Sequence, residues 1–213
     1  MSALPGVEIY DGIEALGLAV NLQGWHSQHP IFAKLIRETC PNAIIEVGTW
    51  KGGSAIHMAG LWSDLATFGL HSKLYCVDTW LGSPEIWNNP NLRAKNPFKH
   101  GYPQVYFQFL HNVKAYGFSA VVVPLPMPSR IGANVLAAES ISAELIYLDA
   151  SHDYADVASD CAHYWNLLKP GGVMFGDDYS WVGVHTAVGE FAFKRGLEIE
   201  DVEGDFWVIR RPV

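Results

Sequence analysis

The stretch AIIEVGTWKGGSA, residues 43–55, decides the fold of this chain. Its first half is a short apolar run rich in β-branched residues, which is typical of a strand buried on both faces. Gly48, Gly52 and Gly53 follow, and they allow the backbone to turn sharply and approach a ligand at the start of a helix. A strand, a glycine turn and a helix in this order predict the first unit of an α/β fold.

The same alternation continues along the chain. Apolar runs alternate with segments whose apolar residues recur at helical spacing, which predicts a parallel sheet with helices on both faces. LKPGG at 168–172 is interpreted as the stop of a helix over 154–168. The tail differs, because two runs flank a Glu-Gly-Asp turn and predict a closing antiparallel hairpin. The expected parallel strands are 43–48, 73–78, 120–125, 144–149 and 172–177.

Length and composition favour one α/β domain over residues 1–213. The net charge of −8 argues against a nucleic-acid partner, which would need clustered Lys and Arg. No secretion signal and no membrane-spanning apolar stretch is visible, so we expect a cytoplasmic protein without a membrane partner. Three widely spaced cysteines, Cys40, Cys76 and Cys161, are expected to be reduced, buried thiols.

Two segments fall outside this pattern. Residues 1–42 contain one expected helix, IFAKLIRET, and form an N-terminal helical extension. Residues 81–102 carry Pro, Asn and Gly without a clear period, and a loop of this length is usually functional, so we expect a lid or substrate loop. His26 and His100 lie in these segments and are candidates for the substrate side of the crevice.

The glycine turn predicts a nucleotide pocket of an unusual kind. The spacing from Gly48 is GxxxGG, whereas a dinucleotide site would read GxGxxG. Glu46 before the turn would repel a pyrophosphate but suits a ligand with an ammonium or sulfonium group. Asp78 ends the second strand, where it can bind ribose hydroxyls, and Trp80 is close enough to offer a face to adenine. The alternative is a tight turn without a ligand.

Four motifs taken together resemble a family. IIEVGTWKGGSA, LYCVDTW, YLDASHDY and LLKPGGVMFGDDY, in this order, resemble class I S-adenosylmethionine-dependent methyltransferases, most of all the group of macrocin-type sugar O-methyltransferases and cephalosporin hydroxylase-like proteins. The resemblance implies a Rossmann-like sheet of order 3-2-1-4-5-7-6 with strand 7 antiparallel. It implies cofactor contacts from Glu46, Gly48, Thr49, Gly52, Ser54, Asp78, Thr79, Trp80, Ser129 and Asp149.

An acidic cluster is expected at the same edge of the sheet. Asp149 ends the fourth strand, and Asp177 and Asp178 end the fifth. Carboxyl ends of parallel strands face one crevice, where three unpaired carboxylates would repel one another unless a cation lay among them. A divalent ion with oxygen ligands, magnesium, satisfies that requirement, and the resemblance implies the same. Relatives often have Asp where this chain has Ser151, which departs from the pattern.

The predicted reaction is methyl transfer to a hydroxyl of a small, oxygen-rich acceptor, a sugar or vicinal diol, with a metal that acidifies the hydroxyl. His152 matches the position of the base in the macrocin-type relatives, and an imidazole titrates in the useful range. Three simpler roles remain open: Asp178 as the cap of a helix near residue 181, His152 as a solvated loop residue, and Asp153 as the N-cap of the 154–168 helix.

Rival functions remain as well. The first is a metal-independent methyltransferase that relies on proximity and His152. The second is a nicotinamide-dependent oxidoreductase on a similar architecture, against which the missing GxGxxG counts. The third is a cofactor-binding protein without catalysis. A homo-oligomer is compatible with the resemblance, but no residue argues for it.

Overall fold

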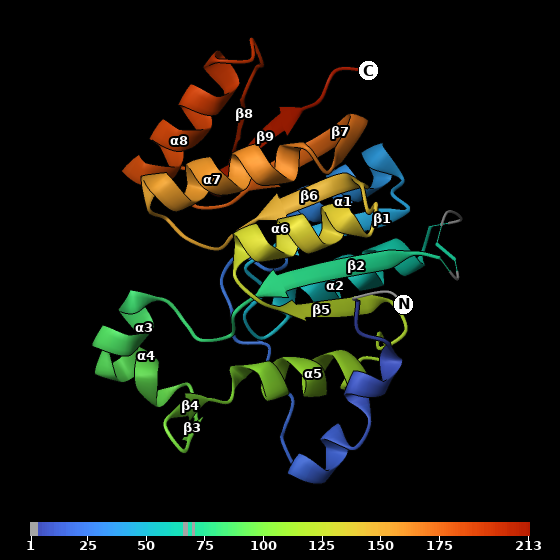
Figure 1. Ribbon diagram of the computed structural model, residues 1–213, viewed down its shortest axis with the longest axis vertical. Helices are drawn as coiled ribbons and strands as arrows, with labels where there is room; N and C mark the ends of the chain where they lie inside the picture. The colour runs from blue at the N-terminus through green and yellow to red at the C-terminus, as the bar shows by residue number, and fades with distance from the viewer. Residues whose placement is uncertain (1–3, 66–67, 70) are drawn as a thin grey trace.

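A seven-stranded sheet forms the centre of the computed structural model, which describes residues 4–65, 68–69 and 71–213 (Figure 1). The strand order is β5-β2-β1-β6-β7-β9-β8, and β9 runs antiparallel to β7 and β8. Counted along the chain without the short β3 and β4, this is the order 3-2-1-4-5-7-6, so the expected sheet is confirmed. The strands are β1 Ala43–Val47, β2 Lys73–Asp78, β5 Val122–Pro126, β6 Ala143–Leu148, β7 Leu168–Gly176, β8 Glu200–Val202 and β9 Phe206–Arg210.

Helices cover both faces of this sheet, as the alternating pattern predicts (Figure 1). On one face, α1, α2 and α5 pack around a core that includes Phe32, Trp62 and Phe109, all fully buried. On the other face, α6, α7 and α8 bury Cys161 and Val188 among others. The helices are α1 Pro30–Thr39, α2 Gly53–Ser63, α5 Val105–Ala115, α6 Ser129–Ala138, α7 Tyr154–Trp165 and α8 Val182–Phe193.

The strand register brings the predicted site residues to one edge. Val47 pairs with Val77 on one side and with Leu148 on the other, and Leu148 pairs with Gly176. The residues that follow these positions therefore leave the sheet side by side. Because the strands are parallel, all of them leave at the carboxyl edge, where open α/β sheets bind ligands.

The start of β7 differs from expectation. LKPGG at 168–172 belongs to the strand, whereas α7 already ends at Trp165. Leu168 pairs with Ala143, and the register shifts before Val173 pairs with Leu145. A register shift of this kind accommodates Pro and Gly residues inside a strand, and these residues imitate a helix stop in the sequence.

The lid, residues 81–102, contains regular structure, whereas the sequence predicts an irregular loop there. It contains α3 Pro84–Asn88, α4 Pro90–Ala94 and a hairpin of β3 Phe98–Lys99 and β4 Tyr102–Pro103. Asn89 caps α4 by accepting hydrogen bonds from the backbone N–H groups of Asn91 and Leu92. These elements are too short to produce a period in the sequence. They stand away from the sheet beyond its carboxyl edge (Figure 1).

The remaining expectations concern the N-terminal segment and the cysteines. The expected helix in residues 1–42 is α1, and two 3-10 turns, Val7–Tyr10 and Ile13–Leu16, precede it; residues 1–3 lie outside the described part. Cys76 and Cys161 are buried as expected, but Cys40, the C-cap residue of α1 (φ 40°), is exposed. Among the described residues, no helix has the length and apolar character needed to cross a membrane.

Candidate active site

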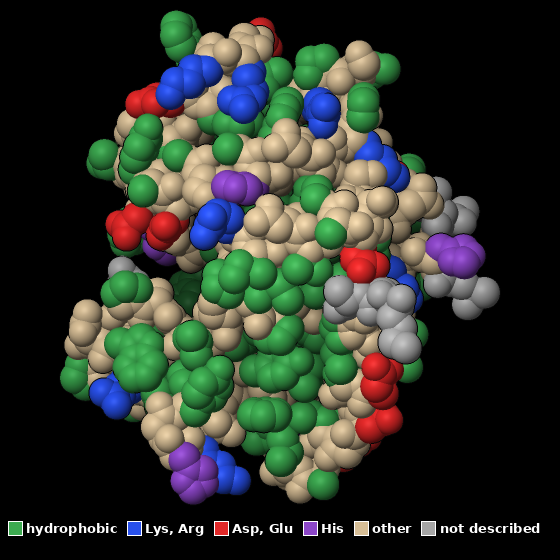
Figure 2. Space-filling view, in the orientation of Figure 1, with side chains coloured by type: hydrophobic (Ala, Val, Ile, Leu, Met, Phe, Trp, Pro, Cys, Tyr) green, Lys and Arg blue, Asp and Glu red, His purple; other side chains and the backbone are tan. Residues whose placement is uncertain are grey.

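A pocket of about 850 Å³ opens at the carboxyl edge of the sheet. The turn after β1 and the ends of β2, β6 and β7 form its floor, and α6 and α7 contribute to one side. Residues 24–27 and the first part of the lid close the other side. Figure 2 shows the surface hollowed between the lid and the body of the molecule. The sequence-predicted residues that line it are Gly48, Thr49, Ser54, Asp78, Thr79, Ser129, Asp149, His152, Asp177 and Asp178, together with the substrate-side candidate His26.

Gly48 is the residue that the turn requires. Its φ is +83°, and a Cβ atom there would collide with the backbone carbonyl of Asp149. Its own N–H donates to the carbonyl of Val77 at 2.9 Å, and the N–H of Asp149 donates to the carbonyl of Val47 at 2.8 Å. The left-handed conformation and the close backbone approach both exclude a side chain. Gly48 therefore lets the turn after β1 and the loop after β6 meet at the pocket floor.

Glu46 lies beneath the turn and outside the pocket lining. Its side chain is fully buried, accepts a short hydrogen bond from Ser54 Oγ and lies 3.6 Å from Cys76 Sγ. Burial raises the pKa of Glu46 to about 7, and the nearby Asp78 carboxylate contributes in the same direction. The structure does not bring Glu46 into the pocket, nor Gly52, which instead is the N-cap residue of α2 with a φ of +83°.

Asp78 holds the glycine turn in place and also lines the pocket. Its Oδ2 accepts hydrogen bonds from the backbone N–H groups of Thr49 and Trp50, both at 2.9 Å. Its Oδ1 accepts from the N–H of Trp80 at 2.8 Å. Three backbone donors on one carboxylate fix the shape of the glycine turn. Asp78 therefore stabilises the turn, independently of any contact that it makes with a ligand.

Trp80 does not reach the pocket. Its side chain is 1% exposed and packs against the rings of Tyr106 and Phe109, with centroids 4.9 Å away in both cases. The indole Nε1 donates to the carbonyl of Trp50 at 2.7 Å. The left-handed backbone of Trp80 (φ 51°) turns its ring into the core, so it offers no face to a ligand in this structure, in contrast to the sequence-based expectation.

One pocket residue, Asp160, gave no signal in the sequence. It lies on α7, 7% exposed, and accepts a short hydrogen bond from the Oγ of Ser129. Burial raises the pKa of Asp160 to about 6. Arg130 also lines the pocket. A single Asp on an otherwise ordinary helix has no periodic or motif signature, and only the fold brings it to Ser129.

The acidic cluster is present, but His152 takes the place that was expected for Asp177. Single ligand atoms of Asp149, His152 and Asp178 lie within 4.8 Å of one another. His152 Nε2 lies 2.6 Å from Asp178 Oδ2, and the Tyr147 hydroxyl donates to Asp149 Oδ2 at 3.0 Å. Burial raises the pKa of Asp149 well above its ordinary value, and the charges of Asp177 and Asp178 add to that rise.

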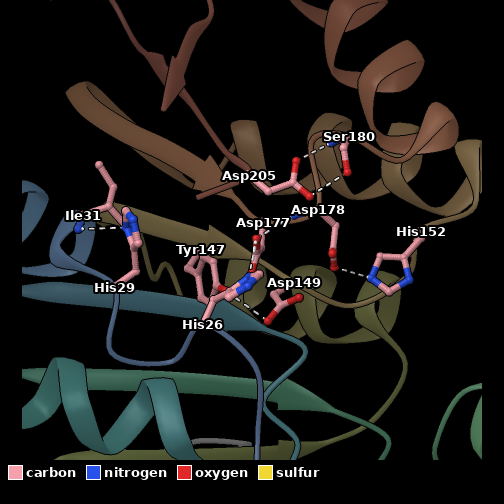
Figure 3. A network of polar contacts seen from close by, with 10 residues as sticks. All are labelled: His26, His29, Ile31, Tyr147, Asp149, His152, Asp177, Asp178, Ser180 and Asp205. Atoms are coloured by element: carbon pink, nitrogen blue, oxygen red, sulfur yellow. Dashed lines mark hydrogen bonds and ion pairs between the residues drawn. The ribbon is translucent and has the colours of Figure 1, made fainter. Parts of the chain in front are cut away.

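Asp177 lies outside that group and pairs with His26. His26 Nδ1 lies 3.1 Å from Asp177 Oδ2, and the Asp177 side chain is 3% exposed against 51% for His26. Figure 3 shows this pair and the Asp178–His152 pair with Asp149 between them. Burial raises the pKa of Asp177, and Asp178 adds to the rise, whereas His26 opposes it. Sequence reasoning did not foresee that His26 reaches the acids, because 151 residues separate it from Asp177.

The donor set fits a divalent cation. Asp149 and Asp178 offer carboxylate oxygens, and His152 offers an imidazole nitrogen, within a span that one ion can bridge. The charges of Asp177 and Asp178 add to the raised pKa of Asp149, and among the described residues no Lys or Arg forms an ion pair with these three carboxylates. Oxygen donors suit magnesium or manganese, and an added imidazole favours manganese or a later transition metal.

Of the three simpler roles considered for this loop, the structure shows one, the N-cap position of Asp153. Trp181, whose ring stacks on His152 with centroids 4.7 Å apart, is the N-cap residue of α8, and Asp178 instead contacts His152. Asp153 does occupy the N-cap position of α7, as expected, but its side chain makes no capping hydrogen bond. His100, the other substrate-side candidate, is not among the residues that line the pocket.

Comparison with known proteins gives consistent matches. A methyltransferase domain family matches residues 45–179. Mycinamicin III 3''-O-methyltransferase of Micromonospora griseorubida is 24% identical over 185 residues, which cover 84% of this chain and 70% of that protein. Two solved structures share the fold at a TM-score of 0.64. One is a TDP-rhamnose 3'-O-methyltransferase of calicheamicin biosynthesis (16% identity, 98% of this chain and 88% of that one). The other is an O-methyltransferase of Streptomyces achromogenes in complex with S-adenosylmethionine (11% identity, 99% and 92%).

Proposed function

The chain belongs to the methyltransferase domain family and is a class I S-adenosylmethionine-dependent methyltransferase, and from this premise we propose a reaction for it. It moves the methyl group of S-adenosylmethionine to a hydroxyl of a small, oxygen-rich acceptor, a sugar or vicinal diol. Relatives named as O-methyltransferases of a mycinamicin and of TDP-rhamnose support an acceptor of this class.

One observation carries the proposal. The glycine turn after β1 and the cluster of Asp149, His152 and Asp178 share a single pocket, and Gly48 touches the backbone of Asp149. A methyl donor seated on the turn therefore lies next to acids and imidazoles that can handle a hydroxyl proton. Methyl transfer needs this juxtaposition, since it is a displacement between two groups held close and in line.

Asp149 and Asp178 are the residues we propose as holders of a divalent ion. Because His152 is proposed as the base and not as a ligand, the holders are carboxylates alone, and magnesium is the ion expected. Asp177, the third expected ligand, borders the same cluster but is engaged with His26. When bound, such an ion lowers the pKa of a nearby hydroxyl and offsets the repulsion among the carboxylates. Tyr147 holds Asp149 through its hydroxyl, and Asp178 stays beside His152.

His152 is the proposed general base. Its Nε2 contacts Asp178, and its ring stacks on Trp181, so both the orientation and the plane of the imidazole are set by neighbours. As the hydroxyl oxygen forms its bond to the methyl carbon, the sulfonium becomes a neutral thioether and the hydroxyl proton passes to the imidazole. A cytoplasmic location, the lack of nucleic-acid and membrane partners and a homo-oligomeric state stay predictions.

Methyl transfer from radiolabelled S-adenosylmethionine tests the proposal directly. The acceptors are a panel of neutral glycosides and vicinal diols, assayed with magnesium and after exhaustive chelation. We expect label in a sugar or diol with magnesium and none after chelation. Transfer that survives chelation selects the metal-independent mechanism. Binding of a reduced nicotinamide cofactor in place of S-adenosylhomocysteine would select the oxidoreductase instead.

A further inference from the structure

Lys51 is a buried cation in the turn that binds the methyl donor in our proposal. Its side chain is 2% exposed, and burial lowers the pKa of its ammonium, with a smaller contribution from Lys95. Within the described part of the chain, no carboxylate forms an ion pair with it. Burying a charge without an opposite charge is costly, so its contacts with neutral oxygens deserve an explanation.

The Lys51 ammonium donates hydrogen bonds to two oxygens, one from each of the two segments that lie outside the sheet. Lys51 Nζ lies 3.2 Å from Gln23 Oε1 and 3.4 Å from the carbonyl oxygen of Lys95. Gln23 belongs to residues 19–27, which we call the strap, and Lys95 belongs to the lid. The strap and the lid together line the side of the pocket opposite α6 and α7, through Gly24, Trp25, Ser27, Ser83, Ile86 and Leu92 among others.

The backbone of Lys51 is tied to the strap as well. Asn112 on α5, fully buried, donates from Nδ2 to the carbonyl of Lys51 and to the carbonyl of Asn21, both at 2.8 Å. Its Oδ1 accepts from the N–H of Asn21 at 3.1 Å and from Gln108 Nε2 at 2.9 Å. A fully satisfied buried network of this kind is rigid. The strap therefore depends on the position of the turn.

The lid is braced mostly from within. Trp87 Nε1 donates to the carbonyl of Leu81 at 2.8 Å, and the Arg93 guanidinium lies over the rings of Trp87 and Phe98 at 5.5 and 5.1 Å. Such contacts keep the lid together as one body but do not attach it to the sheet. The hydrogen bond from Lys51 to the Lys95 carbonyl attaches the lid to the turn after β1.

We propose that Lys51 is a positioning residue that assembles the acceptor side of the pocket by fastening the strap and the lid to the turn. Lys51 follows Trp50, whose N–H is held by Asp78. A ligand on the turn thus acts on the ammonium and, through it, on both segments. The inference rests on the proposed function, because it assigns the strap and lid to the acceptor. Binding at the turn and closure of the lid then stabilise each other, as linkage requires.

Hydrogen–deuterium exchange of the full-length protein tests this without an identified acceptor. The probe ligand is S-adenosylhomocysteine. In Lys51→Met, peptides from the strap and the lid should exchange about tenfold faster than in the wild type, because a hydrogen bond from a charged group is lost. The matched control is Lys95→Met: only the carbonyl of Lys95 accepts from Lys51, so this variant should exchange as the wild type does.

The ligand supplies a readout that a packing role alone would not change. In the wild type, S-adenosylhomocysteine should slow exchange in the lid by a further factor of about three, and in Lys51→Met it should not, although its Kd stays within threefold. Lys51→Arg keeps a cation that can reach both oxygens and should recover most of the protection. The inference is overturned if the strap and the lid exchange in Lys51→Met as they do in the wild type. It is also overturned if they exchange as fast in Lys51→Arg as in Lys51→Met.

Two further outcomes are distinguishable. If Lys51→Met fails to fold, Gln23→Leu decides: faster exchange confined to the strap supports the inference, and unchanged exchange contradicts it. If the wild type does not bind S-adenosylhomocysteine, the proposed function fails. The role of Lys51 in fastening both segments is still decided by the ligand-free comparison.

Discussion

The Nε2 atom of His152 lies 2.6 Å from Oδ2 of Asp178. A second pair, His26 and Asp177, lies beside it at 3.1 Å, so two imidazoles and two carboxylates surround Asp149 (Figure 3). Either imidazole is close enough to serve a hydroxyl bound in this part of the pocket. The resemblance to the macrocin-type group favours His152, whereas the geometry shows that His26 needs to be tested beside it.

Replacing the two histidines separates their roles. His152→Gln should lower turnover by about 100-fold or more at pH 7, since general base catalysis contributes roughly that much. His26→Gln should lower it by less than about tenfold, because our proposal gives His26 no part in the proton transfer and places it only beside Asp177. His100→Gln in the lid is the matched control and should be silent. Magnesium titration distinguishes a general base from a metal ligand. If the His152→Gln protein no longer binds magnesium, His152 is a metal ligand and not the base.

Asp149→Asn should remove the metal without removing the cofactor. The amide keeps the shape of the side chain but loses the charge at the centre of the acidic cluster. Turnover should fall by at least about 100-fold, and the heat of magnesium binding should disappear, while the Kd of S-adenosylhomocysteine stays within a few fold. Wild-type turnover in this variant would contradict the metal role of Asp149.

Glu46 predicts a specific dependence of stability on pH. Because the pKa of Glu46 is raised from 4.5 to about 7, folding favours the protonated carboxyl group. Its contribution is fully present below pH 4.5 and is lost as the pH rises through 7, amounting to about 3 kcal/mol. Urea unfolding at pH 5 and pH 8 should therefore show a smaller loss of stability in Glu46→Gln than in the wild type. Equal losses would refute the assignment.

Gly48→Ala should disrupt the turn. The left-handed backbone and the collision with the Asp149 carbonyl are expected to cost about 3 kcal/mol of unfolding free energy and to weaken S-adenosylhomocysteine binding by more than tenfold. Gly189→Ala on α8 is the matched control, because a Cβ there meets nothing within 4 Å. That variant should be neutral or more stable by up to about 1 kcal/mol. Thermal unfolding and calorimetry measure both effects, and an unaffected Gly48→Ala protein would contradict the account of the turn.

The sheet could be predicted from the sequence because buried parallel strands leave a continuous apolar signal. The residues that end those strands were predicted for the same reason: Asp78, Asp149 and Asp177 follow such runs directly, and register brings them to one edge. Short elements were missed. The five residues of α4 give no helical period, and Pro170 with two glycines imitated a helix stop inside β7.

Side-chain direction and long-range contacts could not be predicted. Trp80 was expected near adenine, but its left-handed backbone turns it into the core against Phe109. Asp160 reaches the pocket only through the tertiary fold, and nothing local distinguishes it from a surface or core residue. His26 lines the pocket, as expected of a substrate-side candidate, but its contact with Asp177 had no signal in the sequence. Lys51 is a further example, because a charged residue in a turn is ordinarily exposed, whereas this one is buried.

The most direct test of the central claim is calorimetric titration of S-adenosylhomocysteine into the purified protein in the presence of magnesium. A methyltransferase with its donor site on the turn after β1 should give saturable binding with one site per chain and a Kd on the order of micromolar. No detectable binding of S-adenosylhomocysteine would contradict the proposal that this pocket holds the methyl donor.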